Sequence, residues 1–296
     1  MAFHLKLGED VAEGFRRIAI AQIEAGVEAA DDPQAQDAAP HAIRKRCKKL
    51  RGLLRLVRGS FGDYSVEQGA LRDAARKLAT VREAGAHLEA LERLCTRDPA
   101  RYQGPDFEQA HDWLESQRDA AVRESREHEC VQEARDMLRA QRERARHWTL
   151  RKEGFDAIEA GLLGTYRAAR RALAEAGDDP TAHHLHELRK HVKYHRFHLD
   201  LLHQLWPPPL LAVVDEAEAL GETLGEHHDI DVLLAALGQD DSAPAVKDAT
   251  ARIAVSVRPE LARLEDAAFS AARRLLAEKP RGFESRMRAY WNADSS

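Results

Sequence analysis

Residues 41–58 read HAIRKRCKKLRGLLRLVR, and residues 186–203 read HELRKHVKYHRFHLDLLH. The two segments align without gaps at an offset of 145 residues. Each opens with His-x-x-Arg-Lys, and each carries a further lysine three residues after that pair. Internal repetition is the first feature to examine in a helical protein, and here it predicts two homologous halves.

The first copy predicts a helix with a cationic stripe. At ~100° per residue, one side of this helix gathers a histidine and five cations in a line roughly 25 Å long. They are His41, Arg44, Lys48, Arg51, Arg55 and Arg58. The neighbouring side is apolar and is expected to dock on the rest of the protein. It carries Ile43, Leu50, Leu54 and Val57.

The second copy repeats this pattern and then weakens. Its stripe consists of His186, Arg189, Lys193 and Arg196. Its predicted packing side consists of Leu188, Val192, Leu199 and Leu202. Asp200 stands where the first copy has Arg55, and His203 stands where it has Arg58. We therefore expect the second half to bind an anion more weakly than the first.

The rest of the chain also favours helices. Aromatic residues make up only 6%, and Gly and Pro cluster at a few breaks instead of recurring as strand turns. The breaks fall near residues 31–33, 61–63, 98–99, 104–105, 177–180, 206–209, 238–244 and 279–280. They divide the chain into about eight or nine helices. We expect an all-α fold of two tandem homologous bundles, residues 1–150 and 151–296, around a pseudo-twofold axis.

Composition excludes several classes of protein. No apolar run is long enough to span a membrane, and the N-terminal segment lacks the apolar core of a signal peptide, so we expect a cytoplasmic protein. Three widely spaced cysteines fit reduced thiols better than disulfides or a zinc site. The net charge of -5 hides a local excess, because residues 38–62 hold eight of the 45 Lys and Arg and no Asp or Glu.

An uninterrupted cationic stripe indicates an anionic ligand. Like charges three or four residues apart destabilise an isolated helix, whereas an ordinary solvated face mixes signs. A long line of Arg and Lys suits an extended chain of phosphates better than a single nucleotide. Arg72, Arg76, Lys77 and Arg82 add a second basic helix. Seven of the fifteen histidines lie in residues 183–203, so we expect affinity to rise as the pH falls towards their usual pKa of ~6.5.

Nucleic acid is an alternative partner, because a phosphate-matched stripe alone does not distinguish DNA from polyphosphate. It is less favoured, because single-strand binders interleave aromatic residues with cations. The first stripe has no aromatic residue, and the second has only Tyr194 and Phe197 nearby. An adaptor that docks an acidic protein is a further alternative. We expect the tryptophans to be core anchors rather than parts of an interface. They are Trp113, Trp148, Trp206 and Trp291.

An enzyme is the remaining alternative, either a metalloprotease or a phosphohydrolase. The histidines of HELRKH are five residues apart, so they point ~140° away from each other on a helix and cannot share a zinc ion. Residues 226–231 read EHHDID and could supply metal ligands, but adjacent helical residues diverge, which favours ordinary surface charge. A phosphohydrolase would also need a carboxylate cluster for Mg²⁺. We therefore expect no catalytic residue, metal or cofactor.

The repeated His-x-x-Arg-Lys-x-x-Lys segments resemble those of the CHAD family, whose name refers to conserved histidines in an α-helical domain. LRDAARKLATVRE in the first half and LGETLGEHHDIDVL in the second extend the resemblance over nearly the whole chain. It implies two four-helix bundles related by pseudosymmetry around a basic central cavity. It also implies binding of inorganic polyphosphate and association with polyphosphate granules. The triphosphate hydrolase signature Glu-x-Glu-x-Lys is absent, so the chain resembles the stand-alone form.

The resemblance also implies which residues line the cavity. One wall would consist of His41, Arg44, Lys45, Lys48, Lys49, Arg51, Arg55 and Arg58, with Arg72, Arg76 and Arg82 beside it. The other wall would consist of His186, Arg189, Lys190, Lys193 and Arg196. Asp200, Glu218, Glu222 and Glu226 depart from this basic pattern and weaken the expected contribution of the second half.

Overall fold

A computed structural model describes residues 3–32, 34, 38–127, 129–239 and 244–294, without the side chains of 80–82, 125–127, 244–245 and 294. Within these residues the chain forms eleven α-helices, one 3-10 helix and no β-strand, so the all-α prediction is confirmed. The helices are α1 (Val11–Asp31), α2 (Ala39–Leu56), α3 (Tyr64–Lys77), α4 (Ala79–Arg97), α5 (Pro105–Glu127), α6 (Cys130–Ala145), α7 (Gly154–Asp178), α8 (Ala182–Leu202), η1 (His203–Leu205), α9 (Pro207–Leu237), α10 (Pro244–Leu275) and α11 (Pro280–Asp294). None of the described helices has an apolar stretch long enough to cross a membrane.

The predicted number of helices, eight or nine, is wrong, because composition does not mark the breaks at Leu78 and Glu129. Leu78 separates α3 from α4 with φ of -106° and ψ of 13°, outside the helical region. Leu78 is completely buried, so packing ends the helix there. Glu129 precedes α6 in the left-handed region, with φ of 48°. Residues other than Gly seldom adopt that conformation, so composition gives little warning of the break.

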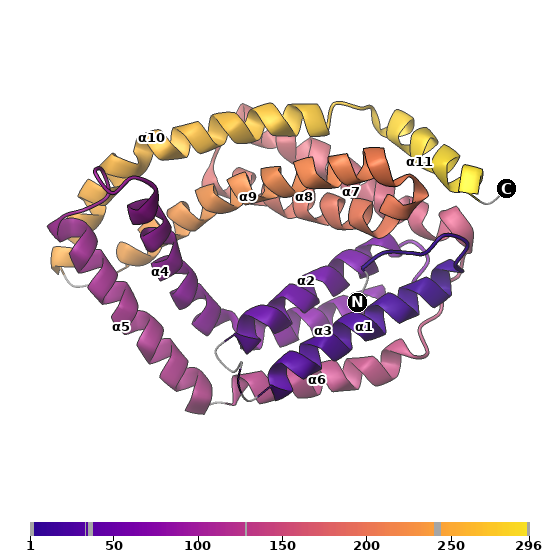
Figure 1. Ribbon diagram of the computed structural model, residues 1–296, viewed down its shortest axis with the longest axis horizontal. Coiled ribbons are helices and arrows are strands. Elements are labelled where there is room, and N and C mark those ends of the chain that lie inside the picture. Colours follow the sequence, from indigo (N-terminus) through magenta and orange to yellow (C-terminus); the bar gives the residue numbers. More distant parts are fainter. Residues whose placement is uncertain (1–2, 33, 35–37, 128, 240–243, 295–296) are drawn as a thin grey trace.

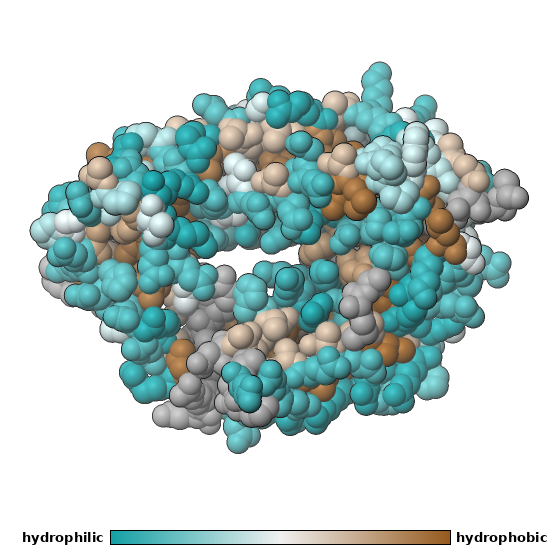
Figure 2. All heavy atoms as spheres, viewed as in Figure 1, coloured by the Kyte–Doolittle hydropathy of each residue, from teal (hydrophilic) through white to brown (hydrophobic). Residues whose placement is uncertain are grey.

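The helices form an elongated ring (Figure 1). α1, α2, α3 and α6 make up one side, and α7 to α11 make up the other. The two sides meet directly where α2 packs on α7 and α8. At the other end, α4 and α5 close the ring, because α4 packs on α9 and α5 packs on α10. Figure 2 shows open space between the two sides, bordered mostly by hydrophilic residues.

Two clusters of buried apolar residues hold the ring together. The larger one joins α1, α2, α3 and α6 to α7, α8 and parts of α9 to α11. The smaller one joins α4 and α5 to the C-terminal part of α9 and to α10. Both copies of the repeat dock as predicted, with each predicted packing side chain at most 1% exposed. These are Ile43, Leu50, Leu54 and Val57 in α2, and Leu188, Val192, Leu199 and Leu202 in α8.

The tryptophans do not all act as core anchors. Trp148 is 3% exposed and stacks on Phe15, with 5.2 Å between the ring centroids. Trp206 is 51% exposed at the start of α9, where its ring meets the Tyr290 ring edge to face at 5.0 Å. The prediction is therefore wrong for Trp206, because a turn holds this side chain on the surface.

Candidate functional site

The cationic side of α2 lies open to solvent beside its buried apolar side. Lys45, Lys48 and Arg58 are exposed, whereas Arg51 and Arg55 are partly buried. Among the described residues, no carboxylate oxygen lies within 4.0 Å of the cationic nitrogens of Lys45, Arg51, Arg55 or Arg58. The structure thus holds several like charges along one helix without compensating them by acidic side chains.

Two arginines of this helix are fixed to α3 by uncharged groups. Nη1 of Arg44 donates to the Ala75 carbonyl oxygen at 2.8 Å. Nε of Arg51 donates to Oε1 of Gln68 at 3.2 Å, and Nε2 of Gln68 donates to the Arg51 carbonyl oxygen at 2.8 Å. The neutral Gln68 amide orients the Arg51 guanidinium group and leaves its net charge available to an anion.

Aromatic rings and a glycine position three more cations. The Arg55 guanidinium lies 4.2 Å from the centre of the Tyr194 ring on α8, and its Nε is buried without a hydrogen-bond partner. Lys49 lies over the Phe3 ring at 4.5 Å, and burial lowers its pKa, whereas Asp200 opposes that shift. A Cβ at Gly164 on α7 would lie 1.9 Å from Nη2 of Arg58, so a larger residue there would displace the end of this arginine.

The second copy lines a hollow between α8 and α9, with a volume of about 390 Å³. We call it the α8–α9 hollow. It is lined by Arg93, Arg189, Lys193, Arg196, Ala217, Glu218, Gly221, Glu222, Gly225, Glu226 and Asp229. Small residues of α9 make space for the cations of α8. A Cβ at Gly225 would lie 3.2 Å from Nη2 of Arg189, and a Cβ at Gly221 would lie 3.8 Å from Cγ of Lys193.

Lys193 has the most perturbed pKa among the cations of the hollow. Burial, together with the positive charges of Arg189, Lys48 and Arg196, lowers its pKa to about 7. Burial also lowers the pKa of Arg189, although Asp229 opposes that shift. Lys48 comes from α2, so the first stripe reaches the electrostatic environment of the second. The two lysines occupy equivalent positions in the repeat.

Acidic residues compensate part of the charge in the hollow. Glu218 pairs with Arg196 at 2.6 Å, Asp229 with Arg93 at 2.7 Å, and Glu226 with Arg97 at 2.8 Å. Glu218 thus pairs with a cation of the second stripe, whereas Glu226 pairs with an arginine of α4. The weaker binding predicted for the second half stays a prediction, now with these ion pairs as its physical basis.

Sequence reasoning missed Arg93 and Arg97, which α4 contributes from the far end of the ring. Their helix carries mixed charges and therefore showed no basic stripe. Conversely, Arg72 and Arg76 are exposed on α3, and both contact Asp73. Lys190 pairs with Glu187, Arg82 has no described side chain, and His41 is exposed near the start of α2.

Four of the seven histidines in residues 183–203 have a pKa below the usual value. Burial is the main cause of a pKa of about 4 for His191 and His228, and of about 3 for His195 and His198. Burial also lowers the pKa of His186, whose ring lies 4.5 Å from that of His228. The expectation that these side chains gain charge near pH 6.5 is therefore wrong for this group, because they pack between helices.

The EHHDID segment binds its own acidic neighbours. Nδ1 of His227 lies 3.0 Å from Asp231, and Nε2 lies 3.0 Å from Glu265 on α10. Burial opposes protonation, but these two carboxylates outweigh it and raise the pKa of His227. No group of three or more His, Cys, Asp or Glu in the described part of the chain is arranged to hold a metal ion. The segment thus ties α9 to α10.

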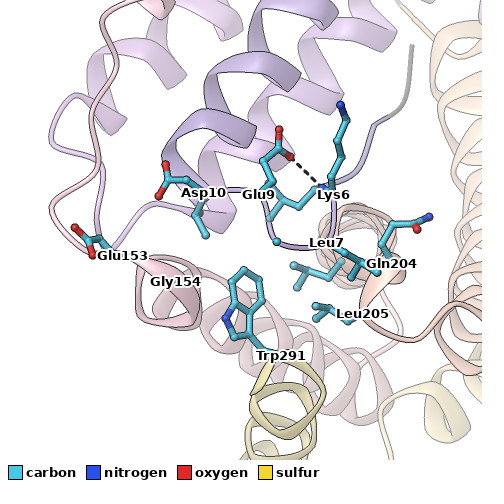
Figure 3. Close-up of a pocket in the computed structure, with 13 residues that line it drawn as sticks. Lys6, Leu7, Glu9, Asp10, Glu153, Gly154, Gln204, Leu205 and Trp291 are labelled. Carbon is cyan, nitrogen blue, oxygen red and sulfur yellow. Dashed lines mark hydrogen bonds between the residues drawn. The ribbon is translucent and has the colours of Figure 1, made fainter. Parts of the chain in front are cut away.

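A separate pocket lies between the N-terminal segment, the start of α7, η1 and α11 (Figure 3). Its apolar lining includes Leu7, Leu205 and Trp291. Its charged lining consists of Lys6, Glu9, Asp10 and Glu153, so three of four charged residues are acidic. None of the residues predicted to bind an anion contributes to this pocket, and its charge does not suit one.

The protein is all-helical and has an internal repeat. The two copies of the repeat form the histidine-bearing, arginine-rich helices at the centre of the fold. The family model described as CHAD domain matches residues 16–238. The protein belongs to the CHAD family, which confirms the resemblance inferred from the repeated motifs. No curated protein sequence matches the chain.

Two solved structures share the fold. The CHAD domain from the plant Ricinus communis superposes with a TM-score of 0.67 and 17% sequence identity, over 92% of this chain and 94% of that one. PptA from Streptomyces chartreusis superposes with a TM-score of 0.60 and 16% identity, over 90% of this chain and 99% of that one. The shared architecture therefore persists where most of the sequence differs.

Proposed function

We propose that this protein binds inorganic polyphosphate without hydrolysing it. The observation that carries the proposal is a set of cations on α2 and just after its end that have no carboxylate within ion-pair distance among the described residues. They are Lys45, Arg51, Arg55 and Arg58. Repulsion between these like charges is costly in an isolated helix. A bound polymer with regularly spaced negative charges removes this repulsion. Non-bridging phosphate oxygens accept from the guanidinium and ammonium groups along the line.

The two halves, residues 1–150 and 151–296, contribute jointly to this binding in our proposal. Several contacts between α2 and α8 support a pseudo-twofold axis at their crossing. Lys49 interacts with Asp200, and Arg55 contacts Tyr194. These contacts are counterparts of each other, because the repeat places Tyr194 at the position of Lys49 and Asp200 at that of Arg55. Such reciprocity is what a twofold relation produces.

The opening of the ring provides the basic central cavity of this proposal. α2 borders it on one side and α9 on the other (Figure 1), and hydrophilic residues surround it (Figure 2). Arg93 on α4 reaches the α8–α9 hollow from a third direction. An extended polyphosphate chain would contact α2 along its length and the α8–α9 hollow at a second point. In a cell, such binding would bring the protein to polyphosphate granules.

The proposal is tested by titrating the protein with long-chain polyphosphate, in competition with single-stranded DNA at equal phosphate concentration. The test variant carries K45Q, R51Q, R55Q and R58Q. The control variant loses the same charge on α5 and α6 through R118Q, R123Q, R142Q and R146Q. We expect the test variant to lose at least tenfold in affinity and the control to stay within threefold of the native protein.

Three outcomes would contradict the proposal. Equal losses in both variants would indicate a general response to net charge. Equal competition by DNA would indicate unspecific binding of polyanions. Release of orthophosphate during the titration would indicate a phosphohydrolase. Circular dichroism of both variants checks that the helices are intact.

A further inference from the structure

The α8–α9 hollow combines a nucleophilic group with groups that hold phosphate. Arg189 and Arg196 flank Lys193 on the same side of α8, one turn before it and one turn after it. The Nε atoms of both arginines are buried without a hydrogen-bond partner. Arginine recognises phosphate through paired donors, so two arginines beside one lysine can hold a small phosphate compound against its amine.

Lys193 differs from the other lysines in its surroundings. It lies partly buried against Gly221, and among the described residues no carboxylate lies within 4.0 Å of its Nζ. Its positive neighbours are Arg189, Arg196 and Lys48, whereas Asp229 is engaged by Arg93. Burial and these charges lower its pKa to about 7. Much of this side chain is therefore a neutral, nucleophilic amine near neutral pH.

Most acidic side chains of the hollow are paired with arginines, so they do not prevent an anion from binding. Glu218, Glu226 and Asp229 each face an arginine within ion-pair distance. Glu222 is exposed at the margin. The volume of about 390 Å³ falls in the range of small-molecule sites and exceeds what a compound of acetyl phosphate size needs.

We propose that Lys193 is a site of spontaneous acylation by acyl phosphates, whose phosphate group Arg189 and Arg196 hold in the α8–α9 hollow. The amine nitrogen attacks the acyl carbon, and a C–N bond forms. The bond between that carbon and the bridging oxygen breaks, and phosphate leaves with the electron pair. The proton lost by the amine passes to the phosphate or to water. The product is an amide, so the hollow loses one cation.

This modification deepens the proposed function, because it rests on the hollow as a phosphate site and would lower its affinity for polyphosphate. Neutralising Lys193 removes the charge at the point where both stripes meet. The cell's supply of acyl phosphates would then set how tightly the second half binds. The chemistry needs no polyphosphate, so it can be measured separately from polyphosphate binding.

The test exposes the native protein to acetyl phosphate at pH 7.5 and measures acetylation of each lysine over time by mass spectrometry. We expect Lys193 to react at least about tenfold faster than the exposed Lys45 and Lys152, because Lys193 lies partly buried between two arginines that hold the phosphate group beside its amine. Pyrophosphate should slow the reaction of Lys193 severalfold without changing that of Lys152. Pyrophosphate should slow the reaction of Lys193 with the neutral ester p-nitrophenyl acetate less, because the ester does not compete for the phosphate-holding arginines and is affected only through the raised pKa of the amine.

Two variants examine the phosphate-holding groups. R189Q and R196Q should each lower the ratio of the acetyl phosphate rate to the ester rate at Lys193 by at least threefold. The ratio cancels any change in the basicity of the amine, and R196Q serves if R189Q does not fold. Acetylation of Lys193 no faster than that of Lys45, absence of protection by pyrophosphate, or an unchanged ratio in the folded variants would each overturn the proposal.

Discussion

Nε2 of His198 on α8 donates a hydrogen bond to the carbonyl oxygen of Gly52 on α2, at 3.1 Å. The donor must be the ring nitrogen, because a carbonyl oxygen only accepts. Burial lowers the pKa of His198 to about 3, so the ring stays neutral at physiological pH. Gly52 has no Cβ to keep the helices apart, and Phe197 fills the space against it. This contact fixes how the two stripe-bearing helices cross.

Replacing Gly52 with alanine should therefore destabilise the protein. The new Cβ would lie 2.8 Å from Cδ2 of Phe197, and overpacking of this kind costs about 1–3 kcal/mol. Gly69 on α3 is the matched control, because nothing lies within 4 Å of a Cβ there. Gly69→Ala should stabilise the protein by up to about 1 kcal/mol, through helix propensity. Urea denaturation of both variants measures the difference, and equal stabilities would contradict the packing described.

The affinity for polyphosphate should fall as the pH rises through about 7. Lys193 has a pKa of about 7 in the free protein, and a bound polyanion would raise it. Below that pH the amine is charged in both states; above it, binding must take up a proton, which weakens binding. Lys193→Arg should flatten the profile, because arginine stays charged. Titrations from pH 6 to 8.5 at constant ionic strength check this, and identical profiles would rule out Lys193 as the titrating group.

The helical fold and the stripe on α2 could be predicted because both follow from periodicity within one segment. Ile43 and Leu50 are buried where a 3.6-residue period places them, and Lys45 and Arg58 are exposed beside them. The break at Leu78 could not be predicted, because neighbours from other elements end that helix. Local patterns determine which side of a helix is apolar, whereas tertiary packing determines where it stops.

The α8–α9 hollow depends on contacts between distant segments, which the sequence does not display. Arg93 lines the hollow from α4, and its ion-pair partner Asp229 comes 136 residues later in the chain. The low pKa values of His191 and His195 arise from burial between helices, so the histidine count alone gave the wrong pH range. The repeat indicated Lys193 as a binding residue, but only its packed surroundings show that it becomes a neutral amine near pH 7.

Salt should weaken polyphosphate binding in proportion to the number of cations that contact the polymer. Each contact releases condensed counterions, so the logarithm of affinity falls linearly with the logarithm of salt concentration. Arg51→Gln and Arg55→Gln should each reduce the slope by about 1, as expected for the loss of one phosphate contact. Arg142→Gln, on α6, should leave the slope unchanged. Titrations between 50 and 300 mM salt measure the slopes, and equal slopes in all variants would place the polymer away from α2.

Replacing Lys193 with methionine should raise the stability of the free protein and lower its affinity for polyphosphate. The unfolded amine has an ordinary pKa, whereas the folded one has a pKa of about 7, so folding opposes protonation. Below pH 7 this cost is fully present, and it is relieved as the pH rises from about 7 towards 10. Methionine keeps the packing against Gly221 without the charge, which should gain about 1 kcal/mol at pH 6.5.

The same variant should lose stability relative to the native protein when polyphosphate is present, because only the native hollow gains from the polymer. Thermal unfolding of both proteins, at pH 6.5 and pH 9, with and without polyphosphate, separates the two effects. Lys152→Met is the control, since Lys152 is exposed and lies outside the proposed binding residues. A methionine variant less stable than the native protein at pH 6.5 without polyphosphate would mean that Lys193 contributes to the fold. A more stable one would mean that the protein maintains this buried charge at the expense of its own stability, as expected of a residue retained for binding.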